Sequence, residues 1–154
     1  MKRKIIAAVT GLAVRKDKSF LLTQRHQPDS PIWHLKWNIP GGALEWGESP
    51  EEALIREFKE ELGVKPTVLY PHPIPITALW YGKDTGFDTD SHILLLCYVV
   101  DIGDQKIDLT LDPEQETCDA EWFTLDDAKK IETLPHTIET VTSALQVIAT
   151  RGII

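Results

Sequence analysis

Four glutamates and one arginine lie close together in the first half of the chain, and they are the residues best suited to do chemistry. The glutamates are Glu48, Glu57, Glu60 and Glu61, and the arginine is Arg56. At about 100° per residue of a helix, the last three glutamates share an arc of about 100°. Carboxylates at helical spacing repel one another, so fold stability alone gives little reason for this arrangement. A divalent cation would relieve the repulsion, because hard cations prefer oxygen ligands.

The helix that must hold these side chains has clear ends in the sequence. Ser49 suits the N-cap, Pro50 suits the first helical position, and Glu52 completes a capping box with Ser49. Gly63 favours the left-handed conformation that ends a helix. The pattern predicts a helix over residues 50–62. Its apolar stripe, expected to pack on the core, comprises Leu54, Ile55, Phe58 and Leu62.

Directly before this helix, Pro40-Gly41-Gly42 predicts a tight turn whose backbone can come close to a ligand. Arg56 lies one turn before Glu60 and is placed to pair with Glu60 or with Glu48. A cation held here can screen phosphate charge and lower the pKa of a bound water, and a spare carboxylate can accept its proton. A merely solvated acidic helix is the alternative, but it does not explain the Gly-Gly turn and the terminal glycine at fixed offsets.

The segment from Gly42 to Val64 resembles the signature of the Nudix hydrolases. That signature is Gly, five residues, Glu, seven residues, Arg-Glu-U, one residue, Glu-Glu, one residue and Gly-U, with U aliphatic. Every fixed position matches, and Phe58 stands at the first U position as an aromatic instead of an aliphatic residue. The flanking segments also resemble the family: Phe20 to Arg25, Trp37 to Gly42, and Ala120 to Phe123.

The resemblance implies an α/β fold in which a mixed β-sheet is sandwiched between α-helices (α/β/α), with residues 1–154 as one domain. It also implies hydrolysis of a diphosphate linkage in a nucleoside diphosphate joined to a group X, with Mg²⁺ or Mn²⁺ as cofactor. Glu60 and Glu61 resemble the main metal ligands, and Glu57 resembles a ligand or the general base. The carbonyl group of Gly41 is similar to the family's backbone ligand.

Two further roles follow from the same resemblance. Arg56 and Glu48 resemble a structural ion pair that orients the site. The family often adds a carboxylate from a loop before a later tryptophan-containing strand; Glu116, six residues before Trp122, matches best, and Glu114 is the second choice. The resemblance leaves the identity of the general base open.

Substrate recognition is expected at Arg25, Trp37, Trp80 and Tyr81, because a guanidinium can contact phosphate and aromatic faces can stack on a nucleobase. Amphipathic core packing is the alternative role for each aromatic residue. A nucleoside triphosphate is the first substrate expected. ADP-ribose or a nucleotide sugar comes second, and a dinucleoside polyphosphate is a further alternative. A Nudix-fold module that binds nucleotides without catalysis is the hypothesis from another class.

Composition fits this interpretation. The chain has 154 residues, 42% of them hydrophobic, and a net charge of −8, which argues against a surface that tracks a nucleic-acid polymer. Cys97 lies in an apolar run, Cys118 shows no metal spacing, and reduced cysteines indicate a cytoplasmic protein. Residues 2–14 have the basic start and short apolar stretch of a signal peptide, but Thr10 and Gly11 interrupt the stretch and residues 15–18 suit a hairpin turn. We therefore expect a first strand here instead of a signal peptide. No run reaches the roughly 20 apolar residues that span a bilayer, so we expect no membrane partner. A monomer and a homodimer both remain open.

The remaining pattern predicts strands, two further helices and an extended segment. We expect the polar run from Asp84 to Ser91 to form a loop that covers the site. Three prolines confine Tyr70 to Pro75 to a linker or an edge strand. Strands are expected over residues 3–14, 19–25, 76–81, 92–101 and 120–124, and helices from about 125–128 and 135–151, the last with Ile138, Val141, Leu145 and Ile148 as its apolar stripe.

Overall fold

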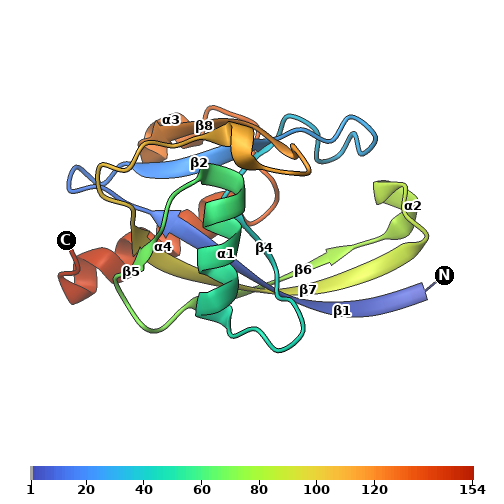
Figure 1. The fold of residues 1–154 in the computed structure, drawn as a ribbon, viewed down its shortest axis with the longest axis horizontal. Helices are drawn as coiled ribbons and strands as arrows, with labels where there is room; N and C mark the ends of the chain where they lie inside the picture. The colour runs from blue at the N-terminus through green and yellow to red at the C-terminus, as the bar shows by residue number, and fades with distance from the viewer. Residues whose placement is uncertain (1) are drawn as a thin grey trace.

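The computed structural model describes residues 2–154, which form a mixed β-sheet, a smaller second sheet and flanking helices (Figure 1). The larger sheet contains β1 (Lys2–Ala13), β4 (Gly41–Ala43), β5 (Thr67–Val68), β6 (Ile74–Trp80) and β7 (Thr89–Asp101). The smaller sheet contains β2 (Phe20–Arg25), β3 (Trp37–Asn38) and β8 (Thr117–Phe123). The helices are α1 (Pro50–Leu62), α2 (Gly82–Thr85), α3 (Leu125–Ala128) and α4 (Thr137–Arg151), with a 3₁₀ turn at Leu109–Leu111.

The long strands β1 and β7 run parallel along their whole length, and their neighbours are antiparallel to them. The strand order is β4-β1-β7-β5, with β6 also paired to β7. In the smaller sheet β2 lies between β3 and β8. The register places Thr10 of β1 opposite Gly41 of β4 on one side and opposite Cys97 of β7 on the other. This pairing holds Gly41 and Gly42 against β1, at the edge of the larger sheet.

The core has two halves because successive side chains of each strand point to opposite faces of its sheet. One half joins α1 to residues of both sheets, among them Val9, Leu21 and Tyr98. The other half packs α3 and α4 against the opposite faces of the sheets, through residues that include Leu12 and Phe20. The expected arrangement of a mixed sheet between helices is confirmed.

Most predicted elements appear with small boundary shifts. The helix over residues 50–62 is confirmed to the residue, with Ser49 as its N-cap and Gly63 as its left-handed C-cap. Ile55 was expected in its apolar stripe, but this residue is 39% exposed. It lies at the outer margin of the arc that Leu54 and Phe58 bury, so that expectation is wrong.

The segment from Asp84 to Ser91 is also more ordered than the expected loop. Its start belongs to α2, whose first N–H, from Gly82, is accepted by Oδ1 of Asp90. Its end belongs to β7, because the parallel pairing with β1 extends to Thr89. Pro75 is tolerated in β6 because this strand pairs on one side only, with β7.

The N-terminal stretch that was compared with a signal peptide contains the strand β1, Lys2–Ala13. Cys97 is buried, Cys118 is exposed, and both are free thiols. Within residues 2–154, no helix combines the length and the apolar character that crossing a membrane requires.

Candidate metal-dependent active site

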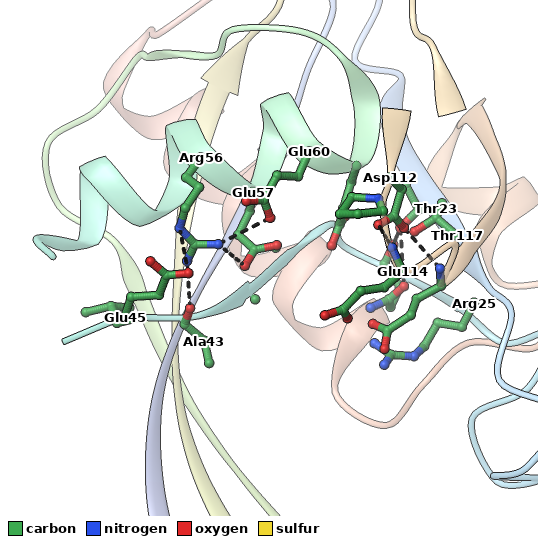
Figure 2. A pocket seen from close by; sticks show the side chains of 17 residues that line it. Thr23, Arg25, Ala43, Glu45, Arg56, Glu57, Glu60, Asp112, Glu114 and Thr117 are labelled. Atoms are coloured by element: carbon green, nitrogen blue, oxygen red, sulfur yellow. Dashed lines mark hydrogen bonds and ion pairs between the residues drawn. The ribbon is translucent and has the colours of Figure 1, made fainter. Parts of the chain in front are cut away.

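A cavity of about 560 Å³ opens between α1, the β4 segment, the end of β2 and the loop that precedes β8 (Figure 2). We call it the acidic cavity because seven carboxylates line it. They are Glu45, Glu57, Glu60, Glu61, Asp112, Glu114 and Glu116. Glutamates from α1 and from a loop more than fifty residues later in the chain therefore face the same space.

The position of α1 depends on a close approach to β1. A Cβ atom on Gly11 would lie 2.8 Å from the ring of Phe58 and 2.9 Å from a methyl group of Leu54. Only a glycine lets the helix pack this tightly on the strand. The apolar stripe thus seats the helix, and its neighbouring acidic edge is turned toward the cavity.

Arg56 ties the acidic edge together (Figure 2). Its Nε and Nη2 donate to both carboxylate oxygens of Glu48, at 2.7 and 3.0 Å. Its Nη1 donates to Glu57 at 2.9 Å and to Glu60 at 3.3 Å, and its Nη2 also donates to the carbonyl oxygen of Ala43 at 3.0 Å. The hydrogen bond to Glu48 is the main reason that the pKa of Arg56 is raised. The two pairings expected from the sequence, with Glu48 and with Glu60, both occur, and Glu57 joins them.

The Gly-Gly turn approaches both the strand and the helix. A Cβ atom on Gly41 would lie 2.0 Å from the carbonyl oxygen of Val9, so no other residue fits there. A Cβ atom on Gly42 would lie 2.4 Å from Oε1 of Glu57. The backbone of the turn is therefore in contact with a carboxylate of the acidic edge, and both glycines line the acidic cavity.

Burial disfavours the charged form of two α1 carboxylates. Burial raises the pKa of Glu57, against the lowering effect of Arg56. Burial and the charge of Glu57 raise the pKa of Glu61 well above its ordinary value, and Arg25 opposes this only in part. Glu61 keeps some solvent contact because it lines the cavity. A raised carboxylate pKa means that the negative charge is unfavourable at this position. A bound cation would neutralise that charge and so stabilise the ionised carboxylate.

The donor set fits a hard divalent cation in its chemistry. Glu57, Glu60 and Glu61 offer carboxylate oxygens, and Gly41 lines the same cavity. Across residues 2–154, however, no three Asp, Glu, His or Cys side chains come close enough together to make a ready-formed metal site. Arg56 Nη1 is hydrogen-bonded to both Glu57 and Glu60, so a cation would share these two carboxylates with the guanidinium.

The loop before β8 contains a residue that the sequence interpretation missed. Asp112 is 7% exposed, and its two carboxylate oxygens each accept a backbone N–H at 3.0 Å, from Glu114 and Glu116. It therefore shapes the loop that carries both candidate ligands. The Asp-Pro pair at Asp112, typical of turns, was the available signal. Both glutamates line the acidic cavity, so the choice between them stays open.

Arg25 lies where the acidic cavity meets a second, mainly apolar one of about 220 Å³, which we call the apolar cavity. Its Nε donates to Gln27 at 2.8 Å, and burial lowers its pKa while Glu116 and Glu61 raise it. Trp33 and Trp80 line the apolar cavity with their rings 5.2 Å apart, edge to face. The sequence interpretation did not select Asn38, which also lines both cavities.

Two expected substrate contacts lie elsewhere. Trp37 is 9% exposed and packs edge-to-face on Phe123 in the core, so it lines neither cavity. Tyr81 is 45% exposed and lines a separate surface groove with Leu79 and Ile5. The structure therefore brings neither Trp37 nor Tyr81 into the acidic or the apolar cavity. Trp37 is buried because it belongs to the core cluster that contains apolar residues of α4, and Tyr81 follows the last residue of β6 and is the N-cap residue of α2.

Comparisons with known proteins agree with this geometry. The ADP-ribose pyrophosphatase of Methanocaldococcus jannaschii is 28% identical over 124 residues, which cover 80% of this chain and 64% of that protein. The 8-oxo-dGTP diphosphatase of Escherichia coli is 36% identical over 53 residues, or 34% of this chain and 40% of that protein. The chain thus spans less than two thirds of the length of either relative.

Solved structures share the fold. The MutT NUDIX hydrolase of Burkholderia pseudomallei superposes with a TM-score of 0.69 at 22% identity, covering 90% of this chain and 97% of that one. The NUDIX domain of Shewanella oneidensis NrtR, complexed with ADP ribose, gives 0.67 at 18% identity, covering 94% and 89%. The NUDIX domain family model matches residues 4–145. Because that match takes in nearly the whole chain, including the acidic helix and both cavities, this protein belongs to the Nudix family.

Proposed function

We propose that this protein is a metal-dependent pyrophosphohydrolase that cleaves a diphosphate linkage in a small nucleotide, with Mg²⁺ or Mn²⁺ as cofactor. One observation carries the proposal: carboxylates from α1 and from the loop before β8 converge on one cavity, and burial raises the pKa of Glu57 and of Glu61 there. A site with this excess of negative charge binds a diphosphate only when cations lie between the two.

The residues of the chain then take distinct parts. Glu57, Glu60, Glu61 and the Gly41 carbonyl group would hold the cation, with Glu116 or Glu114 as a further ligand. When bound, the cation would neutralise phosphate charge and make a water molecule more acidic. Arg56 orients the carboxylates through its hydrogen bonds to Glu48 and Glu57. The raised pKa makes a carboxylate of this edge a better proton acceptor for that water.

Substrate orientation follows from the order of the cavities. Arg25 lies at the junction of the acidic and apolar cavities, where a guanidinium can bind a phosphate oxygen. Beyond it, Trp33 and Trp80 supply aromatic surface in an apolar space suited to a nucleobase. The nucleoside therefore enters the apolar cavity and the diphosphate lies over the acidic edge. Nucleoside triphosphates and nucleoside diphosphates joined to a sugar both satisfy this arrangement.

The test is turnover with Mg²⁺ on a panel of nucleotides, with identification of the products. Glu60→Gln and Glu61→Gln each remove one carboxylate charge and are expected to lower kcat by about a thousandfold or more while the fold is retained. Glu51→Gln is the matched control, because this glutamate is on the exposed side of the same helix. Near-native turnover in either site variant would show that the ligands are assigned wrongly. Tight nucleotide binding without any turnover by the wild type would instead favour a non-catalytic module.

A further inference from the structure

One hydrogen bond fixes the guanidinium of Arg25 at the junction of the acidic and apolar cavities. Its Nε donates to Oε1 of Gln27 at 2.8 Å, and within residues 2–154 no other hydrogen bond reaches this guanidinium. Its Cζ atom lies 5.7 Å from the centre of the Trp33 ring, within the range of a cation–π contact. Because only Nε is engaged, both Nη groups are left to bind a phosphate in the fork geometry of arginine.

The hydrogen bond to Gln27 competes with two carboxylates. Burial lowers the pKa of Arg25, and the charges of Glu116 and Glu61 raise it, so both carboxylates lie near its guanidinium. A guanidinium that turned to either of them would form a charge-assisted pair and would no longer face the nucleotide. It would also occupy a carboxylate that is proposed to hold the cation. The neutral acceptor on Gln27 holds Nε away from that pairing without adding negative charge to the site.

Gln27 is held in turn by His34. The backbone N–H of Gln27 donates to Nδ1 of His34 at 3.1 Å. The carbonyl oxygen of Gln27 accepts the N–H of Ser30 at 2.9 Å, and the N–H of His34 donates to the carbonyl oxygen of Ser30 at 3.0 Å. These three hydrogen bonds close the turn between β2 and β3. The imidazole is therefore an acceptor that fixes the main chain from which the side chain of Gln27 reaches Arg25.

The residue after His34 shows how firmly this turn is held. Leu35 has a φ of +61°, a conformation that residues other than glycine rarely adopt. Such a conformation persists only where the surroundings determine it. Here the N–H of Leu35 donates to the carbonyl oxygen of Arg25 at 2.9 Å, and its own carbonyl oxygen accepts Nε2 of Gln24 at 3.1 Å. The chain thus returns directly to Arg25, and the turn is a defined part of the site.

We infer that Gln27 is a positioning residue for the proposed reaction: it holds the guanidinium of Arg25 toward a phosphate of the nucleotide, and His34 fixes Gln27. The inference rests on the proposed function, which places Arg25 in contact with phosphate. Gln27 acts through the geometry of one hydrogen bond, because its amide carries no charge. Loss of this acceptor is therefore expected to weaken nucleotide binding while α1, which carries the proposed cation ligands, stays folded.

Gln27→Met tests the inference, because it keeps the length of the side chain and removes its oxygen acceptor. The assay uses Mg²⁺ and either ATP or ADP-ribose, whichever the wild type hydrolyses. KM is expected to rise roughly tenfold and kcat to change by less than about threefold, since an interaction that is equal in the ground and transition states affects KM alone. Urea unfolding checks that the variant is folded.

Gln24→Met is the matched control. Gln24 donates to Leu35 of the same turn, but it lines neither the acidic nor the apolar cavity. This variant makes the same chemical change and loosens the same turn without touching Arg25, so it should keep the KM of the wild type. An equal KM in Gln27→Met and Gln24→Met would overturn the inference.

The part of His34 is tested by its acceptor alone. The amide oxygen of asparagine lies as many bonds from the backbone as Nδ1 of histidine, so His34→Asn should keep the KM of the wild type. His34→Ala should raise KM about threefold or more. In the Gln27→Met background His34→Ala should have no further effect on KM, because it acts through Gln27. Additive effects, or a KM raised equally in His34→Asn, would refute this part of the inference.

A binding measurement separates this inference from the proposed function. If the wild type hydrolyses no nucleotide of the panel, the proposed function is refuted. The Kd for ADP-ribose with Mg²⁺, measured by calorimetry, then decides the part of Gln27. A Kd raised roughly tenfold in Gln27→Met and unchanged in Gln24→Met would support it. Equal values in the two variants, or no binding by the wild type, would overturn it.

Discussion

The contact between Gly42 and Glu57 allows a sharp test, because one methyl group acts directly on one carboxylate. In Gly42→Ala the new Cβ would lie 2.4 Å from Oε1 of Glu57, whereas ordinary contacts begin near 3.4 Å. The carboxylate must therefore retreat by about 1 Å, a displacement that can lower the rate about a hundredfold in an organised site. The move also stretches the 2.9 Å hydrogen bond from Arg56, which costs about 1–2 kcal/mol of stability.

Steady-state kinetics with Mg²⁺ and urea unfolding measure the two effects separately. Gly47→Ala is the control, since Gly47 lies in the loop between β4 and α1 with φ +83° and open space around it. It is expected to lose about 1 kcal/mol through backbone strain and to keep its activity.

A second variant tests the cause directly. Glu57→Asp shortens the side chain by one methylene group and leaves room for the new methyl group. It should therefore lower kcat/KM less in the Gly42→Ala background than in the wild type. Full activity of Gly42→Ala, or strictly additive effects of the two changes, would refute the steric reasoning.

Two other predictions concern the carboxylates themselves. The folded-state pKa of Glu61 is raised, so the folded protein loses stability as pH rises from about 4.5 through that pKa. In metal-free buffer at pH 8, Glu61→Gln should therefore resist urea unfolding better than the wild type. The difference should vanish near pH 4, where the wild-type carboxyl is protonated in both states. A difference that does not depend on pH would contradict this, and added Mg²⁺ should stabilise the wild type more than the variant. Asp112→Ala removes the acceptor of two backbone N–H groups and should cost about 2 kcal/mol in urea unfolding and lower kcat/KM, because the loop with Glu114 and Glu116 loses its shape. Unchanged stability would show that water replaces the carboxylate without loss.

Local signals in the sequence determined much of the fold and of the site. The ends of α1 follow from Ser49, Pro50 and Gly63, because capping and the left-handed C-cap depend on neighbours only a few residues away. The acidic edge of α1 follows from helical spacing in the same way. The pairing of Arg56 with Glu48 could also be anticipated, since both residues belong to one continuous segment.

The tertiary structure decided which distant residues share a cavity. Nothing in the local pattern around Trp37 separates it from Trp80, yet one fills the core and the other lines the apolar cavity. Asp112 reaches the site only because the loop before β8 folds back beside α1. Side-chain period and capping are properties of a few consecutive residues, whereas the burial and electric field at a position come from the whole packed chain.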